Sequence, residues 1–211
     1  MTWIEQATQH AAASLAVASL STPTGVIVDP ISGDIFVADF AGHKVRAFQV
    51  AAPTLPTWTG GQPVAESALP VTGLCGAPGT AVGDRATARF TNPAGMARDS
   101  IGNVVIADYG SHLIRTMAAD SDANVATLAG STQGMTDLAG SSAKFDGPRD
   151  VTVDGSGIVY VADSANHRVR KIAVDTTVST LAGTTTGFVD SATPKFAEPS
   201  GISLLSGELF L

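Results

Sequence analysis

The sequence predicts an all-β protein that is built from a repeated unit of four short antiparallel strands. In each of three copies, an Asp is followed by a His four residues later and by an Arg after three more. Short runs rich in Val and Ile flank each copy, and turns that contain Gly, Asp, Ser or Asn separate these runs. A motif that recurs in one fixed context indicates a fold made of repeated units.

Three strands are predicted in the first copy, at residues 26–28, 35–38 and 45–48. Comparable runs follow Pro93 and Pro148 in the other two copies. Most of these runs are apolar throughout, without strict alternation, which favours strands that are covered on both faces. The sheets are therefore expected to stack on one another.

A fourth strand signal follows each triple, at residues 71–74, 125–128 and 178–181. A Gly-rich stretch then leads to a Phe-x-x-Pro sequence that ends at Pro93, Pro148 or Pro199. These prolines lie 55 and 51 residues apart, and the first unit is longer because of a Pro- and Gly-rich insertion at 51–68. Four strands in each period of this length predict the radially stacked sheets, or blades, of a β-propeller.

Together, the Gly-Val-x-Val-Asp, Val-Ala-Asp, His-x-Val-Arg and Phe-x-x-Pro sequences resemble the NHL repeat family of β-propellers, over residues 20–211. The resemblance implies four-stranded antiparallel blades around a central channel, usually six in a closed ring, that serve mostly as binding platforms for proteins or ligands. A minority of similar propellers are enzymes, including amidating lyases and lactonases. The chain holds three complete units and the start of a fourth, which predicts an incomplete, open arc of about three to four blades.

The repeat divides the chain into five segments. They are an N-terminal segment at 1–20, expected to be a helix or a remnant strand; blade 1 at 21–92, with its insertion at 51–68; blade 2 at 93–147; blade 3 at 148–198; and the start of a truncated blade 4 at 199–211.

The repeated polar residues are the first candidates for a functional site. They are Asp39, His43 and Arg46; Asp108, His112 and Arg115; and Asp163, His167 and Arg170. Carboxylate, imidazole and guanidinium groups so close together suggest acid–base or metal chemistry.

Two arguments oppose a catalytic role for this set. A group that is present in every blade serves what every blade needs. Histidines of successive blades would also lie more than about 10 Å apart, which is too far to share a metal. We therefore predict a structural role for this polar set, with Asp accepting hydrogen bonds from turn amides and Arg pairing with a carboxylate or carbonyl between blades. No catalytic residue, metal ligand or cofactor is predicted.

Function is instead expected where the blades differ. The turns that follow the second strand of each blade vary in sequence, and these turns are expected to gather on one rim of the arc. The candidate binding rim consists of Phe40, Tyr109 and Asn166, together with Trp58 from the insertion. For Trp58 the alternative, packing against the outer strand, is equally open.

Charge narrows the choice of partner. The net charge is −7, and the twelve Lys and Arg residues are scattered singly, which argues against a nucleic-acid surface and against an anionic-membrane anchor. The expected partner is a protein or a small-molecule ligand, and open blade edges could support self-association. The predicted function is a non-catalytic binding scaffold. The alternatives are a propeller enzyme of the amidating-lyase or lactonase type with a channel metal, and a truncated fragment without independent function.

Overall fold

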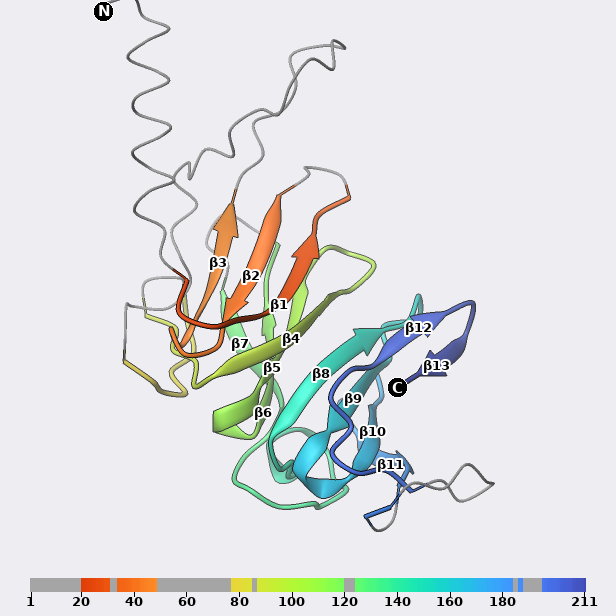
Figure 1. Cartoon of the computed structure of the whole chain (residues 1–211). Helices are drawn as coiled ribbons and strands as arrows, with labels where there is room; N and C mark the ends of the chain where they lie inside the picture. The colour runs from red at the N-terminus through yellow and green to blue at the C-terminus, as the bar shows by residue number, and fades with distance from the viewer. Residues whose placement is uncertain are drawn as a thin grey trace, which may run out of the picture.

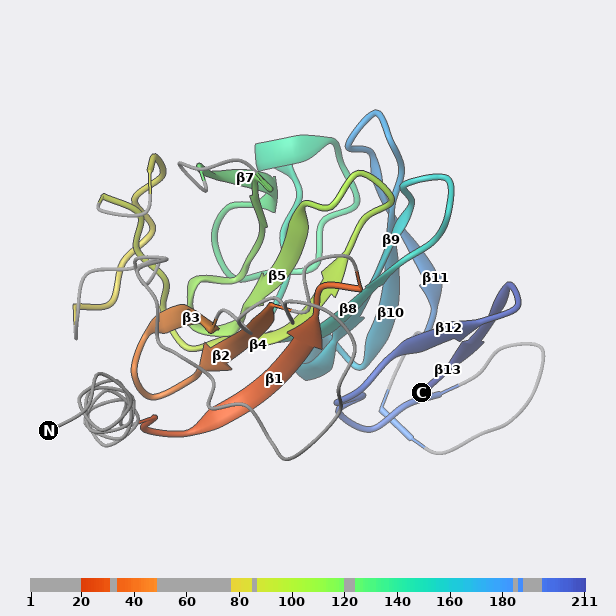
Figure 2. The ribbon, with the colours of Figure 1, turned by 90° about the horizontal axis from the view of Figure 1, so that it is seen from above.

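The residues that the structure describes form four antiparallel sheets that follow one another along an arc (Figure 1 and, from above, Figure 2). This computed structural model describes residues 20–30, 34–48, 77–84, 87–119, 124–183, 186–187 and 195–211. In these ranges the helices are single 3₁₀ turns of three residues each, and none could cross a membrane. They are η1 (Tyr109–Ser111), η2 (Gly140–Ser142) and η3 (Ser164–Asn166).

Within each sheet, every strand pairs antiparallel with the next strand in the sequence. The first sheet consists of β1 (Pro23–Val28), β2 (Ile35–Asp39) and β3 (Lys44–Phe48). The second consists of β4 (Pro93–Arg98), β5 (Val104–Asp108), β6 (Leu113–Met117) and β7 (Val125–Gly130). The third consists of β8 (Pro148–Val153), β9 (Val159–Asp163), β10 (Arg168–Ile172) and β11 (Val178–Ala182), and the fourth of β12 (Ser203–Leu205) and β13 (Glu208–Phe210).

These sheets confirm the predicted fold class, a series of antiparallel propeller blades in an open arc. The fourth-strand signals at 125–128 and 178–181 form β7 and β11. The signal at 71–74, the insertion at 51–68 with Trp58, and residues 1–19 lie outside the described residues.

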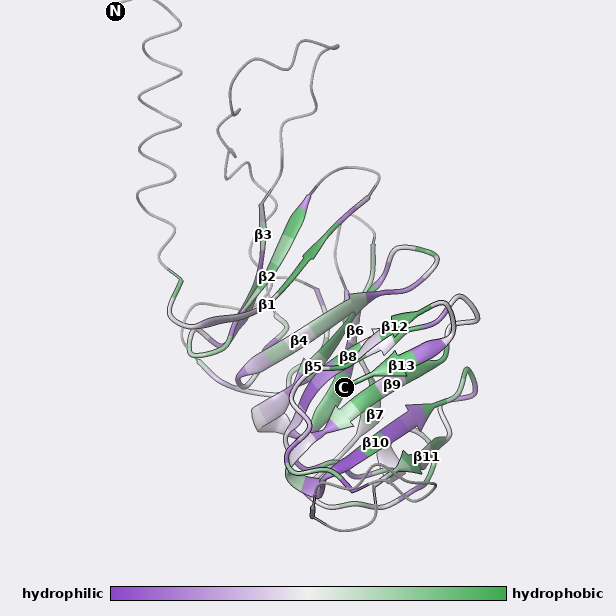
Figure 3. Cartoon of the chain, turned by 45° about the vertical axis from the view of Figure 1, so that its right-hand side comes forward, coloured by the Kyte–Doolittle hydropathy of each residue, from purple (hydrophilic) through white to green (hydrophobic). Residues whose placement is uncertain are grey.

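Strands in the middle of the arc, such as β5 and β9, are largely apolar because neighbouring sheets cover both of their faces. All five residues of β5 are buried, as expected for a strand in the middle of a stack. In Figure 3, β2 is largely hydrophobic, whereas β10 is hydrophilic because it carries Arg168, Arg170 and Lys171. Arg170 is nonetheless completely buried, so its charge must be satisfied inside the protein.

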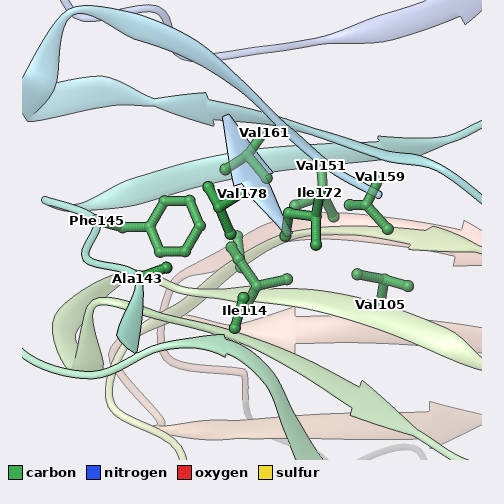
Figure 4. Packing of buried hydrophobic residues seen from close by; sticks show 11 residues of the cluster. Val105, Ile114, Ala143, Phe145, Val151, Val159, Val161, Ile172 and Val178 are labelled. Atoms are coloured by element: carbon green, nitrogen blue, oxygen red, sulfur yellow. The ribbon is translucent and has the colours of Figure 1, made fainter. Parts of the chain in front are cut away.

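Hydrophobic side chains fill the spaces between the sheets. Figure 4 shows the layer between the second and third sheets, where Ile114 faces Val151 and Val178 and where Phe145 closes one end. Phe90 occupies the matching place between the first and second sheets. Both phenylalanines come from Phe-x-x-Pro connections and are fully buried. Each such ring contributes about 1.5–3 kcal/mol through the apolar surface it removes from water.

The innermost strands β1, β4 and β8 all begin with a β-bulge. Their pairing register shifts between Pro23 and Gly25, between Pro93 and Met96, and between Pro148 and Asp150. A bulge leaves its extra residue unpaired and redirects that side chain. The innermost strands also approach each other closely, because a Cβ atom added to Gly25 would lie 2.3 Å from the carbonyl oxygen of Ala94.

Candidate functional site

The aspartates of the repeated polar set accept hydrogen bonds from the connection that enters their own blade. Each one ends the second strand of its blade, and its Oδ1 atom faces backbone N–H groups of the Phe-x-x-Pro segment or its equivalent. The donors are Ser21 and Thr22 to Asp39 (2.8 and 3.0 Å), Thr91 to Asp108 (2.7 Å) and Asp146 to Asp163 (2.8 Å).

The histidines accept hydrogen bonds from the connection that enters the next blade. Each His follows its turn with a positive φ, between 54° and 58°, which aims the imidazole across the gap between blades. The donors are the backbone N–H groups of Asn92 to His43 Nδ1 (3.1 Å), Gly147 to His112 Nδ1 (3.1 Å) and Glu198 to His167 Nδ1 (3.0 Å). An Nδ1 atom that accepts a hydrogen bond belongs to the neutral imidazole with its proton on Nε2.

The arginines of the second and third blades are buried between blades. Arg170 pairs with Asp163 at 2.8 Å and donates to the carbonyl oxygens of Lys144 and Thr136, each at 3.1 Å. Arg115 pairs with Asp108 at 3.4 Å and donates in the same way to the carbonyl oxygens of Arg89 and Ala81. Their guanidinium carbons lie 5.1 and 5.5 Å from the ring centres of Phe145 and Phe90. In the first blade, Arg46 and Asp39 form no such ion pair within the described residues.

Burial dominates the electrostatics of this set. It raises the pKa of Asp108 from 3.8 to about 7, although the Thr91 amide and the Arg115 guanidinium act in the opposite direction. Burial likewise raises the pKa of Asp163. In the second and third blades these carboxyl groups are bonded within and between blades, and the structural role of the polar set stays a prediction.

The candidate binding rim is only partly assembled. Phe40 and Tyr109 come from neighbouring blades and lie together, with ring centres 5.6 Å apart and planes tilted by 52°. Asn166 is directed into its own blade, because its amide donates to the Gly134 carbonyl and to Asp163 Oδ2 at 2.7 and 2.8 Å. Trp58 lies outside the described residues.

A cavity opens on the concave side of the arc, and we call it the inner groove. Its volume is about 810 Å³. Its lining consists of Thr22, Thr24, Gly25, Val26, Phe40, Ala94, Gly95, Met96, Ala97, Arg149, Asp150, Val151, Thr152, Ser200, Ile202, Ser203 and Leu204. Because Phe40 is part of this lining, the aromatic pair of the rim adjoins the inner groove.

Two charged residues, Arg149 and Asp150, face the inner groove, and both belong to the third blade. They occupy the two positions that follow the first proline of the repeat. The corresponding pairs are Thr24 and Gly25 in the first blade, Ala94 and Gly95 in the second, and Ser200 and Gly201 in the fourth. The sequence analysis missed this site, although a position-by-position comparison of the repeats carries the signal. The other three blades have small uncharged residues at these two positions, and the third blade has two charged residues there.

Asp150 occupies space that a glycine leaves free. A Cβ atom on Gly95 would lie 1.9 Å from Asp150 Oδ1. The Asp150 oxygens accept hydrogen bonds from the Val151 and Ile202 amides, each at 2.9 Å, and the second of these bonds joins the third blade to the fourth. Burial raises the pKa of Asp150 above its ordinary value.

Arg149 lies in the bulge of β8 and is exposed. Its guanidinium carbon is 5.9 Å from the centre of the Tyr109 ring, a cation–π distance. Arg149 forms no ion pair with the carboxylates in the described part of the chain. The inner groove therefore combines an available guanidinium, a carboxyl group, several hydroxyl groups and an aromatic ring.

Residues 145–172, which run from Phe145 through β8 and β9 to the end of β10, match the NHL repeat family. The third blade therefore carries an NHL repeat. No curated protein matches it in sequence.

Solved structures show the same propeller fold. A protein of unknown function from Bacteroides thetaiotaomicron is 20% identical with a TM-score of 0.62, over 85% of this chain and 41% of its own length. An auxiliary nutrient binding protein from Bacteroides ovatus is 19% identical with a TM-score of 0.59, over 86% and 42%. A candidate gluconolactonase is 13% identical with a TM-score of 0.55, over 90% and 55%. The chain thus spans about two fifths of the length of the first two, and at these identities the likeness shows the fold alone.

The inner groove does not fit a channel metal. Of its lining residues, Asp150 is the single carboxylate, and the lining contains no His or Cys. Elsewhere in the described ranges, no three residues of the types His, Cys, Asp and Glu come together. A catalytic metal needs about three protein ligands. The lining offers one, so it does not form a metal site by itself.

Proposed function

We propose that the chain is a non-catalytic binding platform whose ligand site is the inner groove. One observation carries this proposal. Arg149 and Asp150, the two residues in which the third blade differs in charge from the other blades, both line a cavity of about 810 Å³. Ligand pockets of proteins have volumes of this order and combine apolar walls with a few polar groups. The nutrient-binding protein of the same fold is in keeping with such a role.

Filling the groove tests this proposal. Val26 lines the groove and is 65% exposed, so Val26→Trp adds bulk inside the cavity without disturbing a packed core. Val174 is 72% exposed and is not part of the lining, so Val174→Trp is the matched control. A library of small metabolites and short peptides is screened by the backbone amide shifts of the ¹⁵N-labelled chain. We expect ligands that shift Met96, Val151 and Ile202, with affinity at least about tenfold lower in Val26→Trp and unchanged in Val174→Trp. Ligands that bind both variants equally would place the binding site elsewhere.

A second candidate, a propeller enzyme, has one observation in its favour. Asp150 lies in the groove with a raised pKa, and such carboxyl groups serve as general acids or bases in many enzymes. Asp150 also accepts two backbone hydrogen bonds, which by themselves account for its position. Hydrolysis of sugar lactones by the purified chain, lost in Asp150→Asn while ligand binding persists, would favour the enzyme over the platform.

A further inference from the structure

The geometry points to a hydroxylated organic anion as the ligand of the inner groove, with its anionic group on Arg149 and its hydroxyl groups on Asp150. This inference rests on the proposed binding function and names the chemical class of its ligand. It depends on three features of the third blade: the position of Arg149, the bonding of Asp150 and the hydroxyl groups around them.

Arg149 is placed to receive an anion. In a regular strand, consecutive side chains point to opposite faces, so Arg149 and Asp150 would be separated by the sheet. The register shift between Pro148 and Asp150 breaks that alternation, and both side chains line the same cavity. The Tyr109 ring lies near the guanidinium on one side, which restricts its orientation. A guanidinium held in this way offers paired N–H donors that match a carboxylate or phosphate.

Asp150 is fixed as a hydrogen-bonding group rather than as a free charge. Each of its oxygens already accepts one backbone N–H, the carboxyl group lies against Gly95, and it forms no ion pair with Arg149. A carboxylate oxygen has a second lone pair available, so each oxygen can still accept a hydroxyl proton from a ligand.

The rest of the polar lining consists of hydroxyl groups. They belong to Thr22, Thr24, Thr152, Ser200 and Ser203. Hydroxyl groups donate and accept, so they are suited to a ligand that carries hydroxyl groups of its own. Phe40 adds an apolar surface at the edge of the groove, on which the carbon face of a ring could lie. A ring that carries hydroxyl groups and one acidic group satisfies all three features.

The test compares sugars that differ only in charge. D-glucuronate, glucose 6-phosphate and neutral D-glucose are titrated against the full chain at low ionic strength, with the Ile202 and Val151 amides as reporters. We expect both anions to bind about ten- to a hundredfold more tightly than glucose, which is the usual strength of hydrogen bonds to charged groups. The two anions distinguish a carboxylate-binding from a phosphate-binding groove, and either preference supports the inference.

Arg149→Gln should abolish the preference for anions, so that glucuronate and glucose 6-phosphate bind no more tightly than glucose does. Lys171→Gln removes one positive charge from β10, away from the groove lining, and should retain the preference.

If glucose binds as tightly as glucuronate, or if Arg149→Gln keeps the preference, the inferred ligand class is wrong while the groove remains a binding site. If the zwitterion L-serine binds more tightly than all the sugars, Asp150 recognises an ammonium group and the inference is also overturned. If a probe instead shifts amides outside the groove, and if Val26→Trp binds that probe as tightly as the wild type does, the proposed function of the groove is wrong.

Discussion

The imidazole of His112 accepts a hydrogen bond of 3.1 Å from the backbone N–H of Gly147, in the connection that enters the next blade. The same bond recurs from Asn92 to His43 and from Glu198 to His167. In all three cases the donor residue has a positive φ and directly precedes the proline that ends the connection to the next blade. The repeated His therefore joins consecutive blades, and its spacing from the Asp follows from the turn between the second and third strands.

Replacing His112 tests this link between blades. His112→Leu removes the acceptor for the Gly147 amide and also places a Leu at a positive φ. The control is Ser206→Leu, because Ser206 is exposed, has a positive φ of 52° and lies in the β12–β13 hairpin. We expect His112→Leu to lower the free energy of unfolding by about 1 kcal/mol more than Ser206→Leu, the worth of one hydrogen bond. Equal losses in urea denaturation would show that the bond between blades contributes nothing.

A second prediction concerns the buried Arg115. Arg115→Ala leaves Asp108 and the Ala81 and Arg89 carbonyls without their partner, so the free energy of unfolding should fall by about 3 kcal/mol. Lys171→Ala, on the corresponding third strand of the next blade, should change it by less than about 0.5 kcal/mol. An Arg115→Ala variant that keeps its melting temperature but loses ligand binding would refute the structural role of the polar set.

The local patterns of the sequence were sufficient to predict the fold. Apolar runs and turn residues located β5 and β9, and the Phe-x-x-Pro sequence located the connections that bury Phe90 and Phe145. These signals act over a few residues, and three copies of them reinforce one another.

The inner groove could not be predicted in the same way, because it depends on register and on distant contacts. A regular strand places Arg149 and Asp150 on opposite faces, and the bulge that brings both to the groove is a property of strand pairing. Asp150 bonds to Ile202, which is 52 residues away, and the space it fills depends on Gly95 in another blade. Phe40 and Tyr109 were predicted as parts of one rim and do lie in contact, whereas Asn166 turns into its own blade.

The third prediction is a pH dependence of stability that comes from Asp108. Its pKa is about 7 in the folded chain and close to 3.9 for an exposed Asp, so between these pH values the folded state binds a proton that the unfolded state lacks. The contribution of Asp108 to stability is therefore greatest below about pH 4 and is lost as the pH rises to about 7. Asp108→Asn removes this titrating group. The difference in the free energy of unfolding between wild type and variant should therefore change between pH 5 and pH 7.5.

The control for this pH dependence is Asp175→Asn. Asp175 is fully exposed, and the Thr177 amide lowers its pKa, so it stays ionised at both pH values. Its replacement should shift the free energy of unfolding by the same amount at pH 5 and at pH 7.5. Parallel curves for wild type and Asp108→Asn would mean that Asp108 remains ionised throughout this range.

The last prediction separates the aromatic pair from the third rim residue. Phe40 lines the groove, and Tyr109 contacts both Phe40 and Arg149, so Phe40→Ala and Tyr109→Ala should each weaken ligand binding about three- to tenfold. Asn166→Ala should do the reverse: its lost bonds to Gly134 and Asp163 lower the free energy of unfolding by about 1 kcal/mol, and ligand affinity is unchanged. Calorimetric titration and urea denaturation of the three variants measure both quantities. If both aromatic variants bind normally and Asn166→Ala does not bind, the ligand site lies at the turn that follows β9 and not in the inner groove.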